Sequence, residues 1–360
     1  MKRKLTILLL GWLLIAPLTS NAATWKSFIQ AWMYPGAPAC NALTEIADGR
    51  RIDVLKPQYY INQTSGILRQ MTTSTDGCNG YDPSNVALVK QFSREQYVTV
   101  ASNRANMAVQ AASSTLIAQA TSTLVSFVVN NDFEGVDIDY EGYGQWTSTE
   151  YANFKTFITG LGNALHANSK KLMVNVPGIG LGYSDLLQSL YKIKYEEIDA
   201  LPVDYIVVLA YDYQYDYGAG ESVAPTGWVN AIISWAKTHI GNQNKIVLGL
   251  PSYGYHGATA GFSITIDTKT QSLTRTASST ATRNSDFEMN WANGGTSNLY
   301  QDTFGIGSKR TNIESQNIQN ISVWHLGGND WFSSTTTEPV IAGTAQVGGN
   351  LSVFGSLTIQ

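Results

Sequence analysis

The sequence predicts an α/β protein, a (β/α)8 TIM barrel, on three observations. Eight short apolar segments recur along the chain, and a stretch with helical periodicity follows most of them. The spacing of the middle segments fits the roughly 30 or more residues of a strand–helix–strand unit. Alternating strands and helices favour a parallel sheet, and eight such units close into a barrel. The expected strands are Phe28–Tyr34, Asp53–Tyr60, Tyr97–Ser102, Phe133–Glu141, Lys171–Pro177, Tyr205–Tyr211, Ile246–Tyr253 and Ile321–Leu326.

Two of the intervening helices have clear signals. Thr147 and Glu150 have the S/T-x-x-E spacing of a capping box, and one apolar stripe at helical spacing follows them. A second helix is expected to begin near Pro225, because proline suits the first turn of a helix. The residues expected to face the core are Phe154, Phe157, Ile158, Leu161 and Leu165 in the first helix and Val229, Ile232, Ile233 and Ala236 in the second.

A doubly wound open sheet is the structural alternative. Gly178, Gly180 and Gly182 follow a strand, but they lack the G-x-G-x-x-G spacing of a dinucleotide site, so we interpret them as a loop. Residues 255–318 alternate apolar and polar side chains in part, with Ser, Thr, Asn and Gly between them. This texture predicts a small antiparallel β-rich insertion between strands seven and eight.

The N-terminus indicates export. Three basic residues, Lys2–Lys4, precede an apolar run from Leu5 to Leu18, and small residues follow to Ala22. This is the pattern of a signal peptide over residues 1–22. An uncleaved anchor is the alternative, but the run is shorter than the ~20 residues of a spanning helix. We therefore expect residues 23–360 to form a secreted barrel, extracellular or periplasmic, where an oxidising environment favours a Cys40–Cys78 disulfide over two free thiols.

Composition excludes several functions. Charged residues make up 14% of the chain, the net charge is −4 and the pI is about 5.6, which does not fit a basic nucleic-acid binder. The histidines form no H-E-x-x-H pair, and the chain contains no G-x-S-x-G motif. We therefore expect neither a metal nor another cofactor, and no serine nucleophile.

The segment Phe133–Glu141 carries the most chemistry. Side chains alternate along a strand, so Asp137, Asp139 and Glu141 share one face while Val136 and Ile138 occupy the other. A strand with its acids facing solvent is the alternative, but both faces of a parallel sheet are normally covered. Carboxylates about 6.6 Å apart along the lumen repel each other, so at least one pKa should be raised.

Glu141 is the last acid of this row. The end of the strand lies at the carboxyl-terminal mouth of a barrel, where barrel enzymes keep their active sites. A glutamic acid that retains its proton there can act as a general acid. The spacing therefore predicts an acid catalyst at position 141.

The acidic segment resembles the D-G-x-D-x-D-x-E signature of glycoside hydrolase family 18, which contains many chitinases and endo-β-N-acetylglucosaminidases. Glu134 stands where the signature has its first Asp. Leu209–Asp212 looks like the family's M-x-Y-D, Gly249–Gly254 looks like its G-x-P-x-Y-G, and Trp324 is in its expected place in strand eight. Residues 97–103, 251–255 and 324–329 look more like the compact branch that contains bacterial spore-germination glycosidases.

The resemblance implies substrate-assisted catalysis, in which the substrate's own 2-acetamido oxygen attacks the anomeric carbon. Glu141 would protonate the leaving oxygen, and Asp139 would orient the acetamide N–H. Asp137 would share a proton with Asp139, and Tyr211 would donate its hydroxyl to the acetamide oxygen. The expected substrate-binding residues are Asp212, Trp324, Tyr253, Tyr213 and Trp32, although simple packing is an open alternative for the tryptophans and Tyr253, and loop capping for Asp212.

The function predicted is a retaining glycosidase that cleaves β-1,4 bonds after N-acetylglucosamine in chitin or its oligosaccharides. Peptidoglycan strands and the core of N-glycans are alternative substrates, and a chitin-binding lectin on the same barrel is the non-enzymatic alternative. We expect a monomer that binds such a carbohydrate, with no nucleic-acid partner and no membrane contact after signal cleavage.

Overall fold

The computed structural model describes residues 28–37, 39, 40, 42, 52–180, 191–275 and 281–329; the expected signal peptide lies outside these residues. Parallel strands pair in the order β1-β14-β8-β7-β6-β5-β4-β2, and β1 also pairs with β2, which closes the barrel. The (β/α)8 prediction is therefore confirmed, and the open sheet is excluded. The barrel strands are β1 (Phe28–Met33), β2 (Ile52–Asn62), β4 (Ser93–Ser102), β5 (Gly135–Tyr140), β6 (Lys171–Pro177), β7 (Tyr205–Leu209), β8 (Ile246–Pro251) and β14 (Asn320–Trp324).

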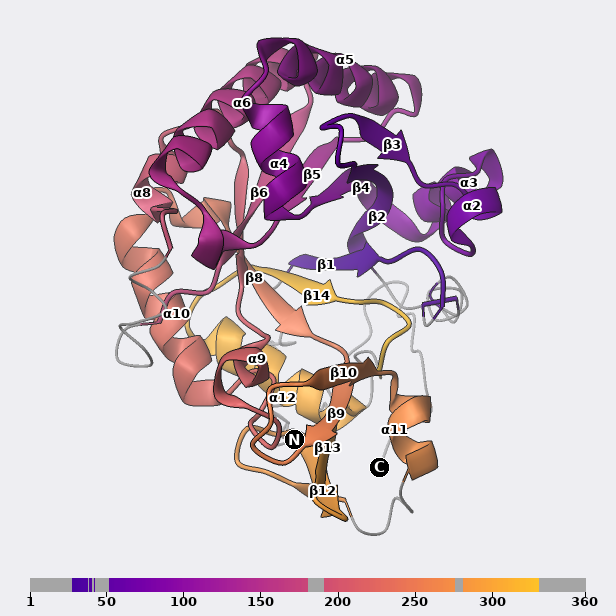
Figure 1. Ribbon diagram of the computed structural model, residues 1–360, viewed down its shortest axis with the longest axis vertical. Helices are drawn as coiled ribbons and strands as arrows, with labels where there is room; N and C mark the ends of the chain where they lie inside the picture. Colours follow the sequence, from indigo (N-terminus) through magenta and orange to yellow (C-terminus); the bar gives the residue numbers. More distant parts are fainter. Residues whose placement is uncertain are drawn as a thin grey trace, which may run out of the picture.

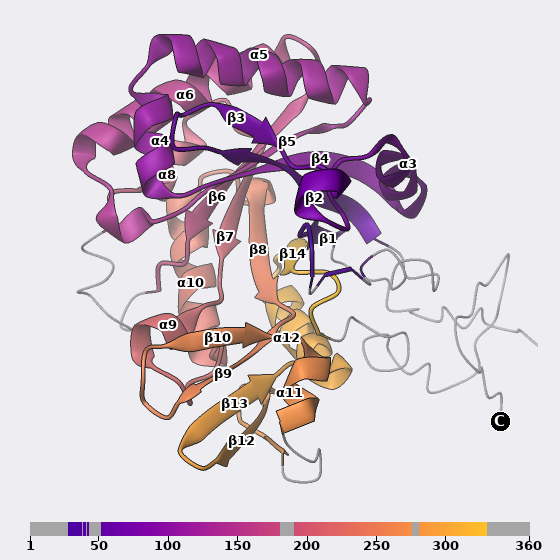
Figure 2. The same ribbon diagram turned by 45° about the vertical axis from the view of Figure 1, so that its right-hand side comes forward.

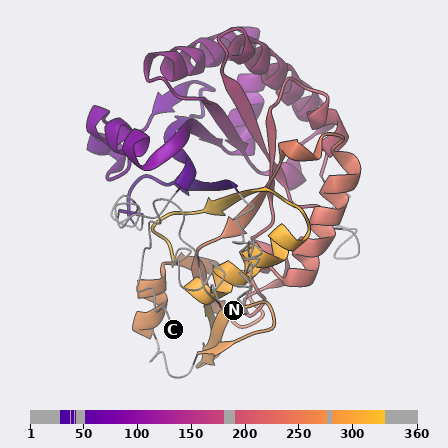
Figure 3. The same ribbon diagram turned by 180° about the vertical axis from the view of Figure 1, so that it is seen from behind.

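Helices cover the outside of the barrel (Figures 1 and 3). They are α3 (Pro83–Phe92), α4 (Arg104–Ala111), α5 (Ser114–Asn130), α6 (Ser148–His166), α8 (Tyr195–Asp199), α10 (Thr226–His239) and α12 (Thr303–Ser315). The predicted capping box opens α6: Thr147 Oγ1 accepts from the Glu150 N–H at 3.2 Å, and Glu150 Oε2 accepts from the Thr147 N–H at 2.6 Å. Both predicted apolar stripes, on α6 and α10, are buried.

A separate antiparallel sheet follows β8, as predicted. Its order is β10-β9-β13-β12-β11, and in Figure 2 it lies at the end of the molecule opposite α5. Glu288 fixes the sheet to the barrel, because its carboxylate accepts from the Val223 and Ala224 N–H groups and pairs with Lys309 at 2.9 Å. The elements are β9 (Gly254–Ala258), β10 (Ile264–Asp267), α11 (Lys269–Arg275), β11 (Thr282–Arg283), β12 (Met289–Asn293) and β13 (Thr296–Tyr300).

The small sheet is shorter than the segment 255–318 that the sequence indicates. Its last strand ends at Tyr300. The helix α12 follows it in the chain, before β14, and packs against the barrel. Lys309 of α12 donates to the Ala224 carbonyl at 2.7 Å, so this helix belongs to the outer layer of the barrel. The glycine and polar content of the segment concealed this helix.

A disulfide closes the region after β1. Cys40 and Cys78 are bonded, with their Cα atoms 5.4 Å apart, as expected. The hairpin partner of β2, β3 (Leu68–Gln70), and the short helix α2 (Thr73–Asp76) lie between β2 and Cys78. The remaining short elements are η1 (Tyr143–Gln145), α9 (Tyr213–Tyr217) and η2 (Gln243–Lys245). Within the described ranges no single helix is long and apolar enough to cross a membrane, and one bent pair, Arg104–Ala111 with Ser114–Asn130, passes that test by length and composition.

Candidate active site

Asp137 lies inside the barrel and is held from three other strands. Its Oδ2 accepts from Trp32 Nε1 of β1 at 2.8 Å and from Thr99 Oγ1 of β4 at 2.9 Å. Its Oδ1 accepts from Asn175 Nδ2 of β6 at 3.2 Å. Because β1 does not pair with β5, the bond from Trp32 crosses the lumen. The inward direction of the acidic face, predicted from alternation and from the apolar Val136 and Ile138 on the opposite face, is therefore confirmed.

The three acids rise from the interior to the mouth. Asp137 is fully buried, Asp139 is half-buried, and Glu141 is exposed just beyond the end of β5. The backbone of Glu141 is fixed on both sides, since its N–H donates to the Ser102 carbonyl at 2.8 Å and its carbonyl accepts from Trp146 Nε1 at 3.3 Å. The backbone that carries the outermost carboxyl group is thus fixed, and the residue is open to solvent.

The predicted repulsion appears in the pKa values of this row. Burial raises the pKa of Asp139 well above its ordinary value, and the charges of Glu141 and Asp137 add to the rise. Glu141 is open to solvent on one side, but loss of water around its carboxyl group, followed by the charge of Asp212, raises its pKa to about 7. Burial also raises the pKa of Asp212 to about 6. The outermost glutamate therefore keeps its proton close to neutral pH, as a general acid must.

Tyr211 and Asp212 reach the row from the end of β7. Tyr211 is buried; its pKa is raised well above the ordinary value by burial and then by the charges of Asp139, Asp212 and Glu141, so it lies near all three acids. Asp212 has a left-handed backbone, with φ of +76°. Such a conformation is uncommon outside glycine and tends to occur at functional sites. The Asp212 carboxylate accepts a hydrogen bond from the Tyr253 hydroxyl, which fixes its direction.

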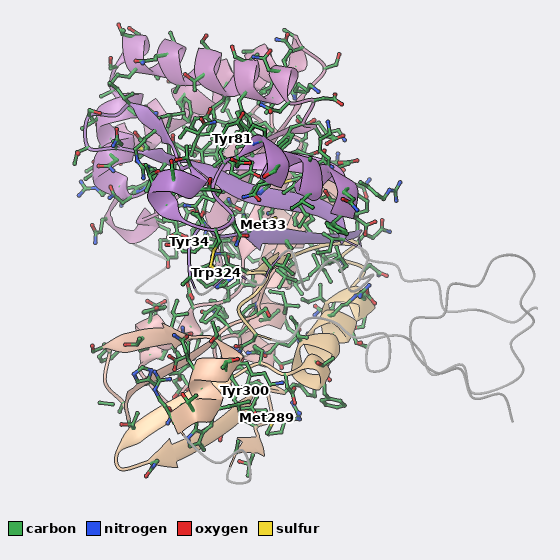
Figure 4. All side chains as sticks on the ribbon, turned by 90° about the vertical axis from the view of Figure 1, so that its right-hand side faces the viewer. Met33, Tyr34, Tyr81, Met289, Tyr300 and Trp324 are labelled. Carbon is green, nitrogen blue, oxygen red and sulfur yellow. A yellow bond between two sulfur atoms is a disulfide. The ribbon has the colours of Figure 1, made fainter. Side chains whose placement is uncertain are left out.

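Trp324 lies at the same end of the barrel with an aromatic group around it. Its half-buried ring lies 6.4 Å from that of Tyr211 in a stacked arrangement, and 5.1 Å from that of Tyr253, edge to face. His325 links it to Tyr34, which is 38% exposed. Figure 4 shows Tyr34 and Trp324 close together between the barrel and the small sheet. This surface of rings suits the apolar face of a sugar.

Three other expected sugar-binding residues have different surroundings. Trp32 is only 4% exposed and lies below the mouth, where its indole N–H holds Asp137. Tyr213 is half-buried and stacks on Tyr217, with ring centroids 4.0 Å apart. Tyr253 is fully buried behind Asp212. Direct contact of these residues with a sugar stays a prediction, and the structure shows each of them supporting other side chains.

Several residues at the site were not found from the sequence. Thr99 and Asn175 hold Asp137, and the buried Tyr143 donates to the Asn175 carbonyl at 3.1 Å. Burial raises the pKa of Tyr143 well above its ordinary value, with Asp139 and Glu141 the next causes, which places its hydroxyl beside the row. Lys56 is fully buried in β2. The sequence offered one signal for Lys56, a lysine within an expected strand that is mostly apolar.

The row of carboxyl groups ends in a protonated glutamate at the carboxyl-terminal mouth of the barrel. Glycoside hydrolases that use acid–base catalysis require catalytic groups of this kind. The sequence profile described as "Glycosyl hydrolases family 18" matches residues 92–330, which include the acidic row, Tyr211, Asp212 and Trp324. The chain belongs to this family and is a glycosidase of family 18.

Solved structures with the same fold cover most of the chain. A chitinase from Chromobacterium violaceum has a TM-score of 0.68 at 20% identity and covers 88% of this chain and 100% of its own. A class V chitinase from Pseudomonas fluorescens has a TM-score of 0.68 at 21% identity, covering 86% and 98%. The spore cortex-lytic enzyme SleL of Bacillus cereus has a TM-score of 0.65 at 15% identity, covering 84% and 71%. The uncharacterized glycosylase YvbX of Bacillus subtilis is 27% identical over 135 residues, which is 38% of each protein.

Proposed function

We propose that this chain is a secreted, retaining hydrolase that cleaves β-1,4 bonds after N-acetylglucosamine with the help of the substrate's acetamido group. The observation that carries the proposal is the exposure of Glu141 together with the raised pKa values of Glu141 and Asp139. Glu141 is exposed with a pKa of about 7, while Asp139 lies behind it with its pKa raised. Family 18 uses substrate assistance in place of a carboxylate nucleophile, and this arrangement suits it.

Each residue of the row then has a distinct task. Glu141 protonates the glycosidic oxygen as the bond to the anomeric carbon breaks, and the same carboxylate later takes a proton from the attacking water. Asp139 accepts a hydrogen bond from the acetamide N–H and stabilises the positive charge of the cyclic intermediate. The hydroxyl of Tyr211 donates to the acetamide oxygen and directs it toward the anomeric carbon.

Hydrolysis of an aryl chitobioside tests the assignment of the acid. Glu141→Gln should reduce the release of the aryl group by at least about 100-fold, because general acid catalysis contributes that much. Glu196→Gln, the same change at an exposed position of α8, is the matched control and should keep full activity. Unchanged turnover in Glu141→Gln, or an equal loss in both variants, would remove Glu141 from this role.

Acetamido participation has its own test. The corresponding aryl cellobioside, with a hydroxyl in place of each acetamido group, should not be cleaved. A thiazoline analogue of the cyclic intermediate should inhibit, and the first product seen by NMR should be the β-anomer. Cleavage of both aryl glycosides at similar rates, or an α-anomer as first product, would exclude this mechanism.

Chitin-type oligomers are the first choice of substrate. The structures from C. violaceum and P. fluorescens are named as chitinases, and this chain matches them over nearly their whole length. SleL is named as a spore cortex-lytic enzyme, and the match covers 71% of it. A product profile over chitotetraose, peptidoglycan and a high-mannose glycopeptide distinguishes these substrates. Recovery of all three intact would point to the lectin.

Export rests on separate observations. The basic and apolar pattern of residues 1–22 is that of a signal peptide, and a disulfide between Cys40 and Cys78 fits an oxidising compartment. Expression with and without residues 1–22, followed by mass spectrometry of the processed chain, tests this part. A mature N-terminus near residue 23 in the periplasm or medium is expected, and an intact chain in the cytoplasm would contradict it.

A further inference from the structure

Lys56 places an ammonium group inside the barrel, beneath the acid row. The side chain is fully buried, and its Nζ has no hydrogen-bond partner among the residues that the structure describes. The Nζ lies 3.3 Å from the centroid of the Trp32 ring and 3.9 Å from Asp137 Oδ2. Burying a lysine is unfavourable unless charges nearby compensate it. Its role therefore lies in those charges.

Asp137 and Asp139 are the charges that face Lys56, both from β5. Asp139 in turn meets charged or ionisable groups from several elements, and Lys56 is the one of them that favours its ionised form. These groups are Lys56 from β2, Asp137 and Glu141 from β5, Tyr143 from η1, and Tyr211 and Asp212 from the end of β7. The electrostatic balance at Asp139 thus depends on a cation supplied by β2.

We propose that Lys56 is a positioning residue whose ammonium group offsets the negative charge of Asp137, so that Asp139 can ionise beside the sugar. This inference rests on the proposed function. Without a cation, two adjacent carboxyl groups must keep one proton between them, because like charges disfavour each other. In this barrel Lys56 takes the place of that shared proton.

The hydrogen bonds of Asp137 agree with this role. Trp32 and Thr99 donate to Oδ2, and Asn175 donates to Oδ1. These three accepted hydrogen bonds fix the direction of the carboxyl group, whose Oδ2 lies 3.9 Å from Lys56 Nζ. The face of the Trp32 indole also attracts the ammonium group and keeps it above the ring. One tryptophan therefore orients both members of the Lys56–Asp137 pair.

The pH range in which Lys56 is cationic covers the range in which Glu141 is protonated. Burial lowers the pKa of Lys56 to about 8, against the opposing effect of Asp137 and Asp139. The pKa of Glu141 is about 7. Lys56 is consequently cationic throughout the range in which Glu141 holds its proton. The compensation is present whenever the catalytic acid is competent.

Lys56→Met tests the inference, since methionine keeps much of the apolar side chain over Trp32 but has no charge. The pH dependence of kcat/KM on an aryl chitobioside is measured for this variant, for the wild type and for Lys56→Met/Asp137→Asn. The acidic limb of the profile reports the ionisation of Asp139 under this proposal. Loss of the cation disfavours that ionisation, so the acidic limb of Lys56→Met should move up by about one pH unit, which is about a tenfold loss on that side of the profile. The basic limb, set by Glu141, should move less.

The double variant separates charge from packing. Removing Asp137's charge together with the cation should return the acidic limb close to its wild-type position, whereas a merely structural role would leave the double variant as impaired as Lys56→Met or more so. Replacing both members of a buried ion pair is also the less disruptive change. If Lys56→Met does not fold, the double variant carries the test, and a limb displaced upward in it overturns the inference.

A second readout does not depend on turnover. The titration of Asp139 is followed by NMR on protein with 13C-labelled aspartate carboxyls, and the Asp139 signal is identified by its loss in Asp139→Asn. The Asp139 midpoint should rise in Lys56→Met and return in the double variant. An unchanged midpoint overturns the role of Lys56 even in an active enzyme. A wild type that cleaves none of the substrates rejects the proposed function instead, and the NMR titration still decides the electrostatic role.

Discussion

A methyl group at Gly249 should displace Tyr211. Gly249 lies in β8, and a Cβ added there would be 2.8 Å from Tyr211 Cε1 and 3.1 Å from the Val208 carbonyl oxygen. Carbon atoms pack at about 3.5–4.0 Å, so the Tyr211 ring must move by roughly 0.7–1.2 Å. Misplacing a catalytic group by about 1 Å can cost up to about 100-fold in rate. We expect Gly249→Ala to lower kcat by about 10–100-fold on an aryl chitobioside.

The fold should survive this change. Overpacking a buried site typically costs about 1–3 kcal/mol, which thermal unfolding measures directly. Gly160→Ala is the matched control, because this exposed position in α6 has its nearest neighbour, Ile117 Cγ2, 4.0 Å from the added Cβ. That variant should gain about 0.5–1 kcal/mol from helix propensity and keep full activity.

Tyr211→Phe shows whether the loss acts through the tyrosine hydroxyl. If it does, Gly249→Ala/Tyr211→Phe should be no slower than Tyr211→Phe alone, because residues in contact are not additive. Two results would refute the reasoning: a Gly249→Ala enzyme with wild-type kcat, or an equal loss of kcat in the Tyr211→Phe background.

Three further predictions concern pH and stability. The kcat/KM should fall above pH of about 7, where Glu141 loses its proton, and Asp212→Asn should move that limb to lower pH because a neighbouring negative charge is removed; an unmoved limb in the pH–rate profile would contradict this. Replacing Cys40 and Cys78 by serine should cost about 4 kcal/mol for a bridge that spans 38 residues, and urea unfolding with and without reductant checks it. Thr147→Ala should lose about 1 kcal/mol in thermal unfolding with kcat unchanged, and a smaller loss would mean that the capping box of α6 contributes little.

The local pattern of the sequence was sufficient for the barrel strands, for helices α6 and α10 and for the acidic face, but not for α12. Alternation along Phe133–Glu141 determines which side chains share a face, and the packing of Val136 and Ile138 on the outside leaves the acids inside. The capping box of α6 was equally legible, because it depends on two residues three positions apart. Both predictions use only distances along one element.

The supports of the acids could not be predicted in this way. Thr99 reaches Asp137 because β4 and β5 pair Thr99 with Asp137 directly, and Trp32 reaches it across the lumen. Such contacts depend on the register of the strands and on closure of the barrel, which alternation does not determine. The sequence indicated that Trp32 is near the site, but its position beneath the acids required the closed sheet.

The surroundings of Lys56 could be found only from the closed barrel, because its partners come from other strands. By its own strand it is a polar residue in a buried run, a feature that predicts neither a partner nor a role. The register places it beside Trp32 of β1, which also holds Asp137, so three strands bring one cation, one ring and one anion together. The cost of burying each charge is reduced by the other, and the row above them then contains fewer uncompensated charges. An acidic row can therefore remain inside a packed barrel because the strand that closes it supplies the opposite charge.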